Sequence, residues 1–97
     1  MVEHIVLFKT RADATSEQRE AMRQALLSLQ DRVPGIVHAT CGYNFSERNQ
    51  GYDVGFVVRF ADRAALDAYL PHPAHQEVVE RYVRPISEGV LVVDYEI

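Results

Sequence analysis

The chain has 97 residues, which suits one domain, and it carries 10 Lys and Arg against 14 Asp and Glu, for a net charge of −4. This acidic balance without a basic run argues against a nucleic-acid-binding surface. Cys41 is the single cysteine, which excludes an internal disulfide. The start MVEHIVLFKT lacks the features of a signal peptide, and no apolar run approaches the ~20 residues of a membrane helix. We therefore expect a cytoplasmic protein.

The first half of the chain predicts a strand, a helix and a second strand. HIVLF is rich in β-branched and aromatic residues, which favours a strand over residues 2–9. Thr15 followed by Gln18 fits a capping box, and apolar residues then recur at helical spacing. The Pro-Gly pair that follows should end this helix near Arg32. Residues 36–45 are typical of a second strand.

The second half predicts a third strand, a broken helix and a fourth strand. The segment YDVGFVVRF, residues 52–60, follows the polar turn SERNQG and favours a strand. The next helix should begin near Asp62, which can cap it, and Pro71 and Pro73 should interrupt it. The segment PAHQEVVERYVRPIS should resume a helix, with Pro73 in its first turn and its end near Pro85. VLVVDYEI, residues 90–97, predicts the last strand.

This βαββαβ order predicts an α+β, ferredoxin-like fold in a single domain over residues 1–97, with a four-stranded antiparallel sheet and helices on one face. HIVLF and VLVV do not alternate between apolar and polar residues, so both faces of these strands should be buried. The simplest cover for the second face is another copy's sheet, which predicts a homodimer through the sheet faces; the alternative is a partly exposed apolar face. We expect Val92 to face that interface, so Val92→Asp should dissociate or unfold the dimer, because an unpaired buried charge is costly.

The segments HIVLFK, VPGI, RNQGYDVGFVVRF, AYLPHPAHQ and VLVVDYE occur in this order and together resemble the stress-responsive dimeric α/β-barrel (Dabb) family over nearly the whole chain. The resemblance implies a dimeric α/β barrel and a role in stress response or as an accessory protein in metabolism. One plant member, olivetolic acid cyclase, is a polyketide cyclase that works without a metal. Its implicated residues match His4, Tyr69 and His75 here, whereas its third-strand histidine falls on Val54, so that polar group is absent.

Two interpretations of these side chains stay open. His75 can act as a general base, with Tyr69 orienting it or donating to a developing enolate oxygen. Equally, His75 can satisfy a backbone carbonyl that Pro71 and Pro73 leave free, and His4 can be a core residue on an apolar strand face.

A metal site is the weaker interpretation of the histidine pair. His72 and His75 are three residues apart, but such a pair is a weak signal because zinc normally takes three or four protein ligands. We therefore expect no metal and no cofactor. His72 should cap or flank the helix break, and His38 should lie on a solvated strand surface.

The sequence leaves open whether the protein is an enzyme. The first hypothesis is a domain that binds a small organic molecule in a cleft between sheet and helices, with no nucleic-acid or membrane partner. The second is a cofactor-free lyase or cyclase acting on an enolisable carbonyl compound. In that reaction His75 would be the base, and Tyr69 and His4 would be polar helpers.

Overall fold

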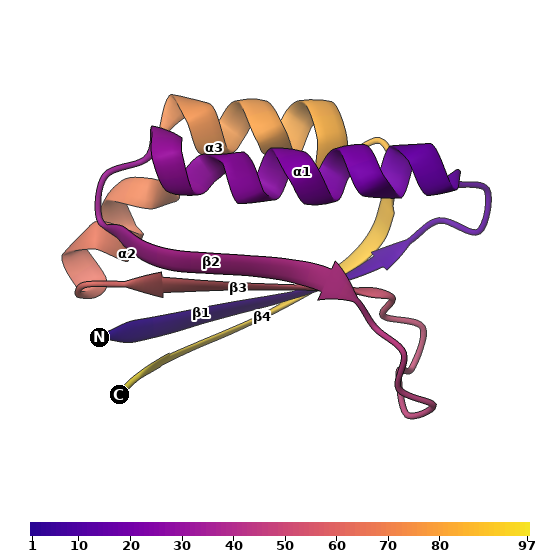
Figure 1. Ribbon diagram of the computed structural model, residues 1–97, viewed down its shortest axis with the longest axis horizontal. Helices are drawn as coiled ribbons and strands as arrows, with labels where there is room; N and C mark the ends of the chain where they lie inside the picture. The colour runs from indigo at the N-terminus through magenta and orange to yellow at the C-terminus, as the bar shows by residue number, and fades with distance from the viewer.

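The structure, a computed structural model that describes residues 1–97, has two layers: a four-stranded antiparallel sheet and helices that all pack on one of its faces (Figure 1). The strands lie in the order β2-β3-β1-β4. The elements in chain order are β1 (Val2–Thr10), α1 (Ser16–Arg32), β2 (Ile36–Tyr43), β3 (Val54–Phe60), α2 (Arg63–Tyr69), α3 (Pro73–Val78), the π-helical turn η1 (Val79–Val83) and β4 (Ser87–Glu96). The predicted α+β, ferredoxin-like fold is thereby confirmed. None of its helices combines the length and the apolar character needed to cross a membrane.

The helices begin where the sequence predicts, because their caps are local. Thr15 accepts a hydrogen bond from the Gln18 N–H at 3.1 Å, and the Gln18 side chain accepts one from the Thr15 N–H at 2.9 Å, which completes the capping box. Asp62 accepts from the Ala65 N–H at 2.9 Å and caps α2. Pro73 occupies the first turn of α3, where a missing N–H costs nothing.

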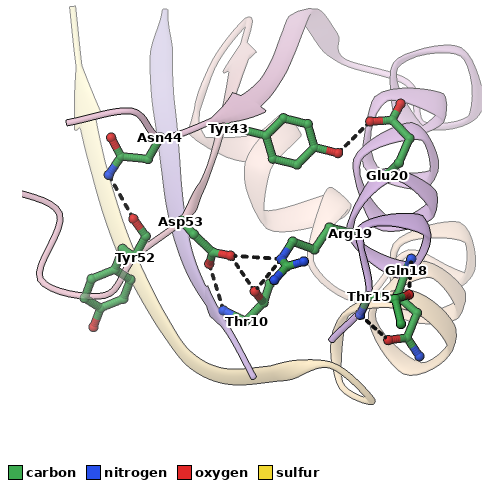
Figure 2. A network of polar contacts seen from close by, with 9 residues as sticks. All are labelled: Thr10, Thr15, Gln18, Arg19, Glu20, Tyr43, Asn44, Tyr52 and Asp53. Atoms are coloured by element: carbon green, nitrogen blue, oxygen red, sulfur yellow. Dashed lines mark hydrogen bonds and ion pairs between the residues drawn. The ribbon is translucent and has the colours of Figure 1, made fainter. Parts of the chain in front are cut away.

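The predicted second and third strands both extend too far into the loop of residues 44–53. Side chains hold this loop away from strand geometry (Figure 2): the Asn44 amide donates to the Tyr52 carbonyl at 2.8 Å. The Asp53 carboxylate accepts from the Thr10 N–H at 2.9 Å and from the Thr10 hydroxyl. Side-chain bonds of this kind compete with strand pairing, and they move the strand ends to Tyr43 and Val54.

The fourth strand begins at Ser87, earlier than predicted, because its pairing with β1 continues past Gly89. In this register Val92 lies opposite Val6. Val6 is only 6% exposed and points to the helices, so Val92 faces the helices too. The placement of Val92 at a sheet-face interface is therefore wrong; its neighbours Leu91 and Val93 face the other way.

The core lies between the sheet and the helices. Phe56 and Phe60 of β3 belong to the same buried cluster as Met22 and Leu29 of α1, and each of the four is at most 1% exposed. The alternate residues of the strands point away from this cluster. We call this opposite, helix-free side the outer face; nothing in the chain packs on it (Figure 1).

The outer face is apolar along β1 and β4. Leu91 and Val93 are each 45% exposed, whereas Ile5 and Leu7 of the central strand β1 are partly buried by their neighbours. HIVLF therefore carries large apolar groups on both faces, as its lack of alternation indicates, but within one chain only the helix side is covered.

Candidate functional site

The three side chains predicted for the site, His4, Tyr69 and His75, line one cavity between the sheet and the helices. Its volume is about 210 Å³. The rest of its wall is apolar and consists of Val6, Phe8, Leu26, Phe56, Leu70, Val79, Val83, Val90 and Val92. An apolar cavity with a few convergent polar groups is the usual form of a small-molecule site.

The proline break between α2 and α3 brings Tyr69 and His75 together. In a continuous helix, residues six apart are rotated by about 600°, or 240° net, so their side chains would diverge. Here the helix ends after Tyr69 and restarts at Pro73, and the two rings lie with centroids 4.3 Å apart. His72 caps the restarted helix by accepting the Ala74 N–H at 3.1 Å, as predicted. No group of three His, Cys, Asp or Glu side chains converges as metal ligands would.

His75 is held by its Nδ1 atom, which lies 2.9 Å from the Leu70 carbonyl oxygen. A carbonyl only accepts, so Nδ1 carries the hydrogen and Nε2 of the neutral ring keeps its lone pair. Burial lowers the pKa of His75 below its ordinary value, against a smaller opposing effect of the Leu70 carbonyl. The two open interpretations of His75 are thus compatible: the bond that satisfies the carbonyl also leaves Nε2 unprotonated.

The hydroxyl of Tyr69 has no hydrogen-bond partner in the chain, although the residue is only 1% exposed. No fully buried side-chain nitrogen or oxygen lacks a partner, so this hydroxyl keeps contact with solvent through the cavity. Burial raises the pKa of Tyr69. The group therefore stays protonated near neutral pH and can donate a hydrogen bond to a ligand.

Asp94 of the edge strand β4 holds His4 in place. The sequence alone does not identify Asp94 as a site residue. The Asp94 carboxylate accepts from Nδ1 of His4, and the two residues are direct neighbours in the β1–β4 register. His4 is 4% exposed, and its ring lies edge-on to that of Tyr69, with centroids 5.9 Å apart. A carboxylate on Nδ1 fixes the orientation of the imidazole and directs Nε2 away from the bond.

The cavity opens at the edge of β4. Val90 and Val92 line it and are nevertheless 50% and 47% exposed. The helices leave this edge strand uncovered, and the cavity is open to solvent between β4 and η1. Val54, on which the third-strand histidine of the plant cyclase falls, is 1% exposed and does not line the cavity. His38 lies exposed on β2, as predicted, and takes no part in the site.

Comparison with known proteins agrees with this architecture. The model of the stress responsive A/B barrel domain family matches residues 2–97. The chain is 31% identical to an uncharacterized protein of Streptomyces coelicolor, over 98 residues that cover 99% of both chains. It is 32% identical to a stress-response A/B barrel domain-containing protein of Arabidopsis thaliana, over 98% of this chain but 36% of that one.

Among solved structures, the chain is similar to a dimeric ferredoxin-like protein of unknown function from Jannaschia sp. CCS1. The two are 32% identical, with a TM-score of 0.80, over 99% of this chain and 98% of that one.

Proposed function

The chain belongs to the stress-responsive A/B barrel domain family, and on that premise we propose that it is a homodimer that binds a small, largely apolar organic molecule in the cavity between its sheet and helices. The family description also supports a role in stress response.

One observation carries the binding proposal: two polar atoms without partners in the chain belong to neighbouring side chains that line an apolar cavity. They are the Tyr69 hydroxyl, which can donate, and Nε2 of His75, which can accept. They suit a ligand with an oxygen that accepts a hydrogen bond from Tyr69 and a nearby hydrogen that is donated to His75. The volume of about 210 Å³ equals the liquid volume of roughly seven water molecules and suits a small ligand.

The homodimer is supported by two observations. The Jannaschia relative is dimeric. In addition, the outer face of this chain leaves Leu91, Val93 and Tyr95 45% to 48% exposed on one strand, and a contiguous apolar face of this kind usually marks an interaction surface. A second copy that presents the same face covers it with closed symmetry.

A second candidate function is cofactor-free proton transfer on an enolisable carbonyl compound. The unprotonated Nε2 of His75 favours it, because this atom can take a proton from the carbon next to a carbonyl group. The Tyr69 hydroxyl would stabilise the enolate oxygen that forms, and His4, oriented by Asp94, would complete the polar end of the cavity.

Native mass spectrometry of the purified protein, followed by a thermal-shift screen of small aldehydes, ketones and phenols, tests the binding proposal. A dimer that carries a reproducible extra mass, or a ligand that raises Tm, is the expected result. Val90→Trp, which fills the mouth of the cavity, should abolish the shift. Val37→Trp is the matched control, since Val37 is similarly exposed, at 45%, but does not line this cavity. Equal responses of both variants would place binding elsewhere.

The enzymatic alternative has its own readout. Ketones that bind should exchange their α-hydrogens with D₂O in the presence of the protein, and NMR measures this exchange directly. His75→Asn should remove the exchange, because the amide has no basic nitrogen. Binding without exchange in the wild-type protein would leave the binding function and exclude proton transfer on the ketones tested.

A further inference from the structure

One row of the outer face combines two leucines with two glycines. Across the sheet, Leu91 of β4 lies beside Leu7 of β1, Leu7 beside Gly55 of β3, and Gly55 beside Gly42 of β2. The row thus has large side chains on one half of the sheet and none on the other. Next to Leu7 the glycines help to form a hollow of about 370 Å³.

Nothing within the chain requires glycine at these two positions. Neither Gly42 nor Gly55 has a positive φ. A Cβ atom added at Gly42 would meet nothing within 4 Å, and one at Gly55 would meet only Leu7 Cδ2, at 4.0 Å. Glycine weakens a strand, and within one it often marks the close approach of another molecule. The reason for these glycines therefore lies outside the chain.

We propose that the hollow receives leucines of a second copy of this chain. The two-fold axis of the dimer runs parallel to the strands and between β1 and β3. It places the partner's Leu7 over Gly55 and the partner's Leu91 over Gly42. The inference rests on the proposed sheet-face dimer and adds its axis and register.

The strand order makes this packing self-complementary. Because strands are evenly spaced, an axis parallel to them carries β1 of one copy over β3 of the other, and β4 over β2, and it leaves each row facing itself. The two leucines of each copy then face the two glycines of the other copy. An axis across the strands through this row would stack leucine on leucine and leave the hollow empty, which loses packing.

Charges on the outer face agree with the same axis. Glu3 and Arg59 are neighbours in the β1–β3 register, and Nε of Arg59 lies 2.8 Å from the Glu3 carboxylate. The axis parallel to the strands places the partner's Glu3 over Arg59, so opposite charges meet at this end of the face. An axis across the strands through their row would bring like charges together.

The size of the outer face is sufficient for a dimer. Its strands are 7 to 10 residues long, and four strands at about 4.8 Å spacing and about 3.3 Å per residue project roughly 450–600 Å². A standard interface buries about 800 Å² of accessible surface per partner, and the accessible area of a face covered by side chains exceeds its projected area.

Exchanging a large and a small residue between positions 91 and 42 tests the proposed register of the dimer. Gly42→Leu fills the hollow and should raise the Kd of the dimer about tenfold or more, measured by analytical ultracentrifugation. Adding Leu91→Ala should restore Kd to within about threefold of the wild type, because the partner's shortened residue 91 again leaves room. Within one chain β3 and β1 separate these two positions, so the coupling can act only between copies. Gly42→Leu with Val93→Ala, one row away, is the control and should not be restored.

Each outcome decides a separate claim. Restoration by Leu91→Ala and not by Val93→Ala supports the register. Additive effects of Gly42→Leu and Leu91→Ala in a wild-type dimer overturn the register but leave the dimer. A wild-type protein that is monomeric at all concentrations overturns both. Circular dichroism checks the fold of each variant, and Gly42→Ala replaces Gly42→Leu if the larger residue prevents folding.

Discussion

Replacing His75 by alanine or by asparagine separates its structural role from its chemical one. The alanine variant loses the hydrogen bond from Nδ1 to the Leu70 carbonyl, worth about 0.5–1.5 kcal/mol. It also loses the ring contact with Tyr69 at 4.3 Å, worth about 0.5–1.5 kcal/mol more. We therefore expect His75→Ala to lower the free energy of unfolding by about 1–3 kcal/mol in urea denaturation.

The asparagine variant is the matched control. Its amide nitrogen stands at the position of Nδ1 and can still donate to the Leu70 carbonyl, but no atom replaces Nε2. His75→Asn should therefore recover about 0.5–1.5 kcal/mol of the loss. It should nevertheless remain as defective as His75→Ala in ligand binding or α-hydrogen exchange.

Two results would refute this reasoning. If His75→Asn is no more stable than His75→Ala, the bond to the Leu70 carbonyl does not stabilise the fold. If His75→Asn binds ligand and exchanges hydrogen as the wild type does, Nε2 has no chemical role and His75 only closes the helix break.

Three further predictions concern buried groups. Tyr69→Phe should change the free energy of unfolding by less than about 0.5 kcal/mol, because its hydroxyl has no partner to lose, yet weaken ligand binding about tenfold in calorimetry. In an NMR titration His75 should protonate below its ordinary pKa of about 6.5, because burial disfavours the charged ring. The unfolded state therefore binds more protons than the folded state below about pH 6.5. The free energy of unfolding of the wild type, relative to His75→Asn, should fall as pH drops through about 6.5. Burial raises the pKa of Cys41 to about 11, so this thiol should react with Ellman's reagent at pH 8 much more slowly in the native protein than in urea, and equal rates would contradict its burial.

The sequence predicts the features that local chemistry determines. The capping box at Thr15, the cap at Asp62 and the restart of the helix at Pro73 each depend on residues within one turn. The meeting of Tyr69 and His75 follows from the same local break, although the resemblance to a family, rather than periodicity, pointed to the pair.

What the sequence does not determine depends on the register between distant strands. Asp94 becomes a partner of His4 only through the pairing of β1 with β4, 90 residues away along the chain. The same pairing decides that Val92 faces the cavity, whereas VLVV by itself allows either face because both are apolar. Antiparallel pairing of the first and last strands would have indicated Asp94, because it sets this residue directly opposite His4 on the helix side of the sheet.

The side chains of VLVV are apolar for a different reason on each face of the sheet. On the helix side, Val90 and Val92 form the open wall of the cavity, and Asp94 ends that row by holding His4. On the outer face, Leu91 and Val93 have no cover within the chain and would find it in the proposed dimer. A strand that only closed the core would need one apolar face. β4 carries two apolar faces because alternate side chains line the cavity on one side and, in the proposed dimer, would meet a second copy on the other.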